Sequence, residues 1–141
     1  MNGLNDVMQN KILQYAFFAA ALAVALGAFG AHGLKPLLDD NSMQMYQTAV
    51  QYHFYHALAL IICGMLQLFT GSKRAGIAAA LFGAGLFCFS GSLYAITFLK
   101  ATGADVPRWL GPVTPVGGLL FIAGWVVLLI SAGTIAGSKR S

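Results

Sequence analysis

The chain has 141 residues, of which 58% are hydrophobic and 9% are charged, and its formal net charge is +4. A soluble domain carries about 25% charged residues to keep its surface in water, so this composition excludes an ordinary soluble domain. The eight lysines and arginines occur singly or in pairs, and without a basic stripe interleaved with aromatic residues no nucleic-acid partner is expected.

Four long stretches without any charged residue define the predicted elements. They separate Lys11 from Lys35, Asp40 from Lys73, Arg74 from Lys100, and Arg108 from Lys139. Each exceeds the roughly 20 residues that an apolar α-helix needs to cross a bilayer, and no ten-residue alternation indicates a β-barrel. We therefore predict an all-α integral membrane bundle, a single domain over residues 1–141 with transmembrane helices at about 12–30, 46–68, 76–99 and 116–136.

The first predicted helix is longer than the roughly 7–15 apolar residues of a signal-peptide core, so we expect it to be retained as a span. It carries small residues four apart, at Ala19, Ala23, Gly27 and Ala31. This pattern lets two helix backbones approach closely. His32 follows at the end of the helix.

The second predicted helix contains the stretch QYHFYHALAL, residues 51–60, which places two histidines in an apolar segment. On a helical wheel Gln51, Tyr52, Tyr55 and His56 share one polar face, and His53 lies at its edge. We expect this face to point toward protein. An α-helix rises about 1.5 Å per residue, which predicts that His56 lies near the middle of the membrane. The preceding acidic pair, residues 39–40, predicts a cap for this helix.

The third and fourth predicted helices carry small residues seven apart, a spacing that favours left-handed packing of neighbouring helices. These residues are Gly76, Gly83, Ser90 and Thr97 in the third helix and Gly117, Gly124 and Ser131 in the fourth. Thr114 followed by Pro115 predicts the N-cap and first residue of the fourth helix. Ser90 of the third helix is expected at a depth similar to that of His56, and Tyr94 nearer the surface.

Polar residues from three helices are therefore expected to converge in the outer half of the bundle. The candidate ligand-binding residues are His56, Tyr52, Tyr94, Gln51, Ser90, His32 and His53. Ionisable residues at membrane depth often have functional roles, although polar groups there also serve simply to hydrogen-bond neighbouring helices. All four acids lie outside the spans and no carboxylate or cysteine stands beside the histidine pair, so no catalytic residue, metal site or cofactor is predicted.

The distribution of lysine and arginine predicts the orientation of the chain. The side that holds both termini has Lys11, Lys73, Arg74, Lys139 and Arg140, and the other side has Lys35, Lys100 and Arg108. Under the positive-inside rule this excess predicts that both termini are cytoplasmic.

Four ordered motifs resemble the domain-of-unknown-function 423 family, small bacterial membrane proteins related to eukaryotic transmembrane protein 256. They are GAFGAHGLK (27–35), YQTAVQYHFYHALAL (46–60), FSGSLY (89–94) and GPVTPVGGLLFIAGW (111–125). The resemblance covers nearly the whole chain and implies a four-helix protein of the bacterial inner membrane, but it implies no activity. The motif positions in this chain are Gly27, Gly30, His32, Gly33, Tyr52, His56, Ser90, Gly91, Tyr94, Thr114, Pro115, Gly117 and Gly118.

Three functions remain open at this point. The first is a non-enzymatic membrane protein whose polar cluster serves packing or assembly, either with itself or within a larger membrane complex. The second is binding of a small hydrophobic ligand or redox cofactor, a quinone or haem, at His56, Tyr52 and Tyr94. The third is a pathway for protons or small solutes, which the absence of Asp and Glu from the spans disfavours. In all three the lipid bilayer surrounds the chain.

Overall fold

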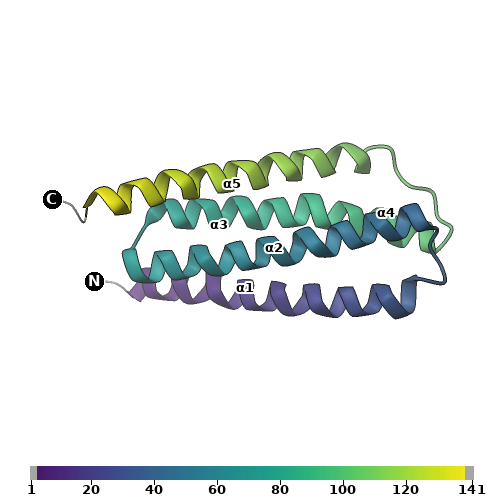
Figure 1. Ribbon diagram of the computed structural model, residues 1–141, viewed down its shortest axis with the longest axis horizontal. Helices are drawn as coiled ribbons and strands as arrows, with labels where there is room; N and C mark the ends of the chain where they lie inside the picture. The colour runs from purple at the N-terminus through teal and green to yellow at the C-terminus, as the bar shows by residue number, and fades with distance from the viewer. Residues whose placement is uncertain (1–2, 139–141) are drawn as a thin grey trace.

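The computed structural model describes the backbone of residues 3–138 and the side chains of residues 11–133, and the backbone it describes contains helices and no strands (Figure 1). Four of its segments are long and apolar enough to cross a membrane, at Lys11–Leu34, Asp40–Thr70, Lys73–Ala101 and Leu110–Gly133. The predicted all-α architecture with four transmembrane helices is therefore confirmed.

Two of the four spans contain a π-helical turn, which the sequence patterns did not predict. The first span consists of α1 (Gly3–Phe29) and the π-helical turn η1 (Gly30–Leu34), and the second is α2 (Asp40–Thr70). The third consists of α3 (Lys73–Gly85), the π-helical turn η2 (Leu86–Ser90) and α4 (Gly91–Ala101), and the fourth is α5 (Leu110–Ser138).

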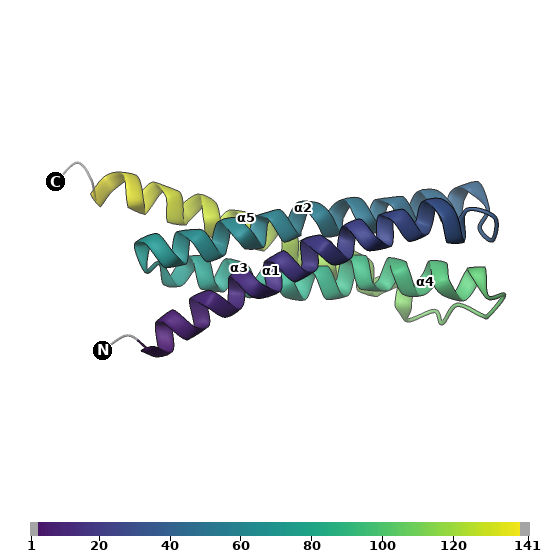
Figure 2. The same ribbon diagram turned by 90° about the horizontal axis from the view of Figure 1, so that it is seen from below.

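The spans lie in chain order, so that each packs mainly against the next one. α1 packs on α2, α2 packs on the third span, and α3 of that span packs on α5. Both ends of the chain lie at one end of the bundle, and loops 35–39 and 102–109 lie at the other, which we call the distal end (Figure 1). Figure 2 shows α1 crossing the other helices obliquely. The cytoplasmic location of the termini stays a prediction, and Lys139 and Arg140, on which it partly depends, lie outside the described residues.

α2 begins six residues before the predicted position because Asp39 caps it. The Asp39 side chain accepts a hydrogen bond of 2.7 Å from the backbone N–H of Ser42. This bond lowers the pKa of the Asp39 carboxyl below its ordinary value, and the Ser42 hydroxyl and the charge of Lys100 act in the same direction. The acidic cap predicted for this helix is therefore confirmed. The helix is about one and a half turns longer at its start than predicted.

Asp39 gives the bundle an acid-dependent contribution to stability. Because its pKa in the folded protein lies below the ordinary value of 3.8, the contribution is complete above that value and is lost as the pH falls through the lowered pKa. We expect Asp39→Asn, whose amide also caps a helix, to lose this pH dependence while keeping most of its thermal stability at neutral pH. Asp39→Ala is expected to lower the melting temperature even at neutral pH.

Circular dichroism melts in detergent between about pH 2.5 and 7 test this expectation, since the window brackets the ordinary carboxyl pKa. Asp105→Asn, which changes an exposed acid in the other distal loop, is the matched control and is expected to behave as the wild type. The cap does not act as described if Asp39→Asn and the wild type lose stability in parallel on acidification.

α5 begins at Leu110, which shows that the predicted start at Thr114–Pro115 is wrong. Pro115 lies inside the helix, where it removes one backbone donor, whereas Pro112 falls in the first turn, whose N–H groups need no helical partner. Thr114 does not cap the helix. It contacts the Ser92 hydroxyl at 2.6 Å, so its side chain joins α5 to α4.

The predicted packing stripe of α5 is confirmed, whereas that of the third span holds only in part. Gly117 and Gly124 face Phe89 and Phe82 of the third span, and Ser131 contacts Ser72 at 3.1 Å. In the third span Ser90 and Thr97 are buried, but Gly83 is exposed and has open space around it. The extra residue per turn in η2 changes the phase of the helix, so residues seven apart across it do not share a face.

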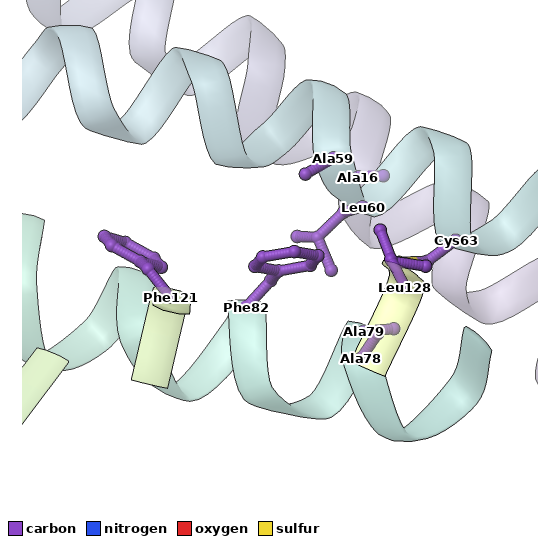
Figure 3. Close-up of a cluster of buried hydrophobic side chains, with 9 residues drawn as sticks. All are labelled: Ala16, Ala59, Leu60, Cys63, Ala78, Ala79, Phe82, Phe121 and Leu128. Atoms are coloured by element: carbon purple, nitrogen blue, oxygen red, sulfur yellow. The ribbon is translucent and has the colours of Figure 1, made fainter. Parts of the chain in front are cut away.

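A cluster of small and aromatic side chains forms the core between the middle of the bundle and the end where the chain begins and ends. Phe82 is completely buried in it (Figure 3). Around it lie Ala16, Ala59, Leu60, Cys63, Ala78, Ala79, Phe121 and Leu128. Phe82 and Phe121 connect this core to His56 of α2.

Candidate functional site

Both histidines of α2 lie on the buried seam of the helix. The seam repeats at alternating intervals of four and three residues, through Ser42, Tyr46, Ala49, His53, His56, Leu60 and Cys63. His53 is 7% exposed and His56 is 5% exposed, so the prediction that His53 lies at the edge of the packing face is wrong. The helical wheel assigned the packing face of α2 from the polarity of its residues. In the structure, the contacts with the third span determine which side of α2 is covered.

His56 lies close to the middle of α2 and bridges α2 to α5. Its Nδ1 lies 2.8 Å from the Tyr52 carbonyl, and its Nε2 accepts a hydrogen bond of 3.3 Å from the Trp125 indole N–H. A carbonyl only accepts and an indole N–H only donates. His56 is therefore a neutral imidazole with its proton on Nδ1 and its lone pair on Nε2.

Aromatic rings surround the His56 imidazole. The Phe121 ring stacks on it with a centroid distance of 3.5 Å and an interplanar angle of 7°. Tyr52 lies nearly parallel to it at 5.9 Å and stacks on Phe89 of η2 at 4.7 Å. Tyr52 itself is 39% exposed, so one edge of this ring stack reaches the surface of the bundle.

His53 belongs to a separate polar group nearer the distal end. Its Nδ1 lies 3.2 Å from the Tyr94 hydroxyl of α4. Tyr94 packs against Tyr46 with a centroid distance of 5.4 Å, and the Tyr46 hydroxyl donates to the Leu26 carbonyl of α1 at 2.7 Å. This group connects three spans. The structure thus places Tyr94 beside His53, whereas the ring stack around His56 is formed by other residues.

Ser90 closes the π-helical turn η2 and is buried. Its hydroxyl donates to the Ala49 carbonyl of α2 at 3.0 Å. Two residues later, the Ser92 hydroxyl donates to the Phe89 carbonyl at 2.9 Å. Because Ser92 has only one hydroxyl hydrogen, Thr114 is the donor in the contact between them. The third span is therefore hydrogen-bonded to α2 on one side and to α5 on the other.

Gln51 and Tyr55 lie on the outer surface of α2, so the prediction that the whole polar face points toward protein is wrong. The Gln51 amide donates to the Tyr55 hydroxyl at 2.8 Å, and the pair is exposed. Tyr55 is 51% exposed. Because α1 and the third span cover other sides of α2, this polar face remains uncovered within the described chain.

His32 is an exposed residue of η1, in the first span. Within the described residues no interaction connects it to His53, His56 or Tyr94. The seven predicted residues therefore do not form one cluster. His53 and Tyr94 form one group, His56 and Tyr52 form another, and Ser90 is buried against α2. Gln51 lies on the exposed face of α2, and His32 is separate from all of them.

The aromatic residues Trp125, Phe121 and Phe89 were not among the predicted site residues. One signal for Trp125 was available, because tryptophan in membrane proteins concentrates at the interfaces, whereas Trp125 lies deep within the fourth span. Tyr46 was also missed as a site residue. The sequence predicts Tyr46 as the first residue of the second helix, but the helix begins six residues earlier. Tyr46 therefore lies within the helix and not at its end.

A cleft of about 550 Å³ opens beside His56 between α2 and α5, and Phe89 of η2 forms part of its wall. Tyr52, Phe121 and Trp125 line the same cleft. Within the side chains described at residues 11–133, no group of three or more His, Cys, Asp or Glu residues is placed to hold a metal ion.

Comparison with known proteins gives one matching family and several relatives. A family model described as "Protein of unknown function (DUF423)" matches residues 26–118. A UPF0382 membrane protein of Staphylococcus haemolyticus is 44% identical over 116 residues, which cover 82% of this chain and 89% of the relative. The UPF0382 membrane protein YwdK of Bacillus subtilis is 43% identical over 114 residues, covering 80% of this chain and 88% of the relative.

A more distant relative comes from another bacterial group. A UPF0382 membrane protein of Haemophilus influenzae is 35% identical over 121 residues, which cover 86% of this chain and 92% of the relative. No solved structure matches the chain. The relatives are named as bacterial membrane proteins, in agreement with the four apolar spans and with a location in the inner membrane.

Proposed function

The chain belongs to the DUF423 family of membrane proteins. From its contacts and its exposed polar face we propose that it is a non-enzymatic membrane protein that assembles with a second copy of itself. In this proposal the buried polar groups hold the four spans together, and the exposed polar face of α2 joins two copies within the membrane.

The buried contacts support the first part of the proposal. His53 reaches Tyr94 on α4, and His56 reaches Trp125 on α5, while Ser90 bonds the backbone of α2. Each contact joins two different spans, as polar residues in membrane helices commonly do. Both ring nitrogens of His56 are engaged in hydrogen bonds, which favours packing over acid–base chemistry.

The single observation that carries the second part is the exposed pair Gln51–Tyr55. Gln51 lies eleven residues after the start of α2 at Asp40, about 16 Å along the helix axis. The bond to Tyr55 uses one of the two N–H donors of the Gln51 amide. Polar groups left facing hydrocarbon cost several kcal/mol, because lipid tails offer no hydrogen bonds. Gln44 and Gln47 are exposed on the same side of α2, closer to the distal end. We infer that another polypeptide covers this side.

The surface beside these glutamines fits a close helix contact. A groove of about 400 Å³ runs between α1 and α2 and is lined by Gly27, Gly30 and Ala31 together with Gln47 and Gln51. Small residues permit close backbone approach in membranes. A glutamine amide both donates and accepts hydrogen bonds, so a pair of identical faces related by a two-fold axis is self-complementary. A second copy of the chain therefore satisfies the amides without any other partner.

The expected result is a loss of self-association when the polar pair is removed. Interhelical hydrogen bonds in membranes contribute about 0.6 kcal/mol on average and up to about 1.7, and a two-fold interface contains each contact twice. Gln51→Leu combined with Tyr55→Phe is thus expected to weaken dimerisation about tenfold. Energy transfer between labelled copies in liposomes, measured as a function of protein density, gives the dimerisation constant.

The matched control is Gln14→Leu combined with Tyr15→Phe, which removes the same chemical groups from exposed positions on α1. This control is expected to dimerise as the wild type does. A wild type that stays monomeric at every density, or a control as weak as the α2 variant, contradicts the proposal. Stoichiometric recovery of a different membrane protein on this face shows that the partner is not a second copy.

A further inference from the structure

The cleft beside His56 has the features of a ligand site that the proposed assembly does not use. It lies on the side of α2 that faces α5, and its volume of about 550 Å³ falls within the range of small-molecule pockets. Its walls are flat: Tyr52, His56 and Phe121 lie within 27° of one another, and Phe89 stacks on Tyr52. Such walls accept a planar ring between or against their faces.

Besides the Tyr52 side chain, two polar atoms from neighbouring spans meet at this cleft, and their chemistry is defined. His56 Nε2 presents a lone pair, because the imidazole proton is held on Nδ1 by the Tyr52 carbonyl. Trp125 Nε1 presents a hydrogen, and the two atoms are 3.3 Å apart. This hydrogen bond is slightly longer than the usual range of about 2.7–3.2 Å, and it is longer than the 2.8 Å contact of His56 with the Tyr52 carbonyl. Trp125 is 45% exposed, so its ring has room to move.

A hydroxyl group can satisfy both atoms of this pair through a single oxygen. It can donate its hydrogen to His56 Nε2 while its oxygen accepts from the Trp125 N–H, whereas a carbonyl or ether oxygen can satisfy only Trp125. A lipid acyl chain has no group for either atom. We propose that the cleft binds a lipid-soluble molecule with a flat ring that bears a hydroxyl group, which inserts between His56 and Trp125.

The position of the cleft is compatible with such a molecule. His56 is near the middle of α2, sixteen residues from its start, and Trp125 lies deep within the fourth span. The exposed edges of Tyr52 and Trp125 place the opening on the side of the bundle that faces lipid, so the ligand enters from the bilayer. Self-association involves Gln51 and Tyr55, which do not line the cleft, although the Tyr55 ring contacts that of Tyr52. Neither site requires the other.

The two tryptophans of the chain provide the measurement. Trp125 lines the cleft, whereas Trp109 lies exposed in the distal loop. In Trp109→Phe only the cleft tryptophan fluoresces, and in Trp125→Phe only the loop tryptophan does. The probe is 4-bromophenol, whose bromine quenches a nearby indole, and the matched compound is 4-bromoanisole, which lacks the donating hydrogen. Both are titrated into nanodiscs of phosphatidylcholine that contain the full chain.

The expected result is saturable quenching of Trp125 by 4-bromophenol, with an affinity about tenfold higher than that for 4-bromoanisole, the difference made by one hydrogen bond. Trp109 is expected to show only weak, linear quenching by both. In His56→Ala the phenol and the anisole are expected to bind equally. This ratio does not change in a variant that merely becomes less stable. Gly118→Leu, which places a side chain in the cleft, is expected to abolish saturable quenching by both compounds.

Two outcomes overturn the inference. Linear quenching of Trp125 that matches that of Trp109 means that the cleft holds acyl chains only. Equal saturable binding of phenol and anisole to the Trp109→Phe protein means that the cleft takes flat rings but does not recognise a hydroxyl. Either result leaves the measurement of self-association unaffected.

Discussion

Gly117→Ala is expected to destabilise the bundle by about 3 kcal/mol, whereas Gly118→Ala, one residue further along α5, is expected to leave it as stable as the wild type. The reason is the close approach of two backbones. A methyl group at position 117 would collide with the backbone nitrogen of Phe89 in η2, and helix axes must then separate, which costs roughly 1–3 kcal/mol or more in packed cores. At position 118 the nearest atoms are Phe89 ring carbons at 3.8 and 3.9 Å, an ordinary contact.

Thermal unfolding in detergent, followed by circular dichroism, separates the two variants. Gly118→Ala also gains helix propensity, up to about 1 kcal/mol, so its melting temperature is expected to equal or exceed that of the wild type. Similar melting temperatures for Gly117→Ala and Gly118→Ala would falsify the close contact between α5 and η2.

Phe82 and Gly124 are expected to show strong energetic coupling in the core. Phe82 is fully buried, and a methyl group at position 124 would lie 2.7 Å from its ring. Phe82→Ala alone is expected to cost about 3 kcal/mol, since large-to-small changes of buried phenylalanine cost roughly 3–5 kcal/mol in soluble cores and less where lipid replaces water outside. Gly124→Ala alone is expected to cost about 2 kcal/mol through overpacking.

The double variant tests whether these two effects share one cause. With the ring absent, the methyl group at position 124 fills part of the cavity, so Phe82→Ala combined with Gly124→Ala is expected to cost at least about 1 kcal/mol less than the sum of the single changes. The same melts measure all four proteins. Gly133→Ala is the control, because nothing lies within 4 Å of a methyl group there. Additive effects would show that Gly124 and Phe82 do not contact each other.

The four spans could be predicted because one physical constraint acts on every residue in them. Charged side chains are expelled from hydrocarbon, so the gaps between Lys11 and Lys35 and between Arg108 and Lys139 mark helices without further information. The Asp39 cap was also predictable, because a short carboxylate accepts hydrogen bonds from the free N–H groups at the start of a helix. The packing stripe of Gly117, Gly124 and Ser131 also followed from its regular spacing.

The geometry of the candidate site could not be predicted because it depends on contacts between spans. The turn η2 changes the phase of the third span, so Ser90 is buried although Gly83, seven residues earlier, is exposed. Nothing in the local sequence around residues 86–90 indicates this extra residue per turn. The separation of His53–Tyr94 from His56–Trp125 likewise depends on which helix faces which side of α2. Sequence periodicity identifies polar faces, but it does not determine the neighbour that each face meets.

α1 lies at one side of the bundle, and this position affects how the bundle unfolds locally. α1 packs mainly on α2. Only 11% of the residues in the most apolar 18-residue stretch of the first span are buried, compared with 39% in each of the two spans that follow. The spans after it retain His56–Trp125 and Ser90 without α1, which contributes Ala16 and Ile12 to the core around Phe82. We therefore expect α1 to have the lowest local unfolding free energy of the four spans. Near the distal end the Tyr46 hydroxyl donates a hydrogen bond to the Leu26 carbonyl of α1, and near the other end Leu13 and Ile12 lie against Gly64 of α2. α1 is thus expected to separate from the bundle as one unit, after both attachments are lost.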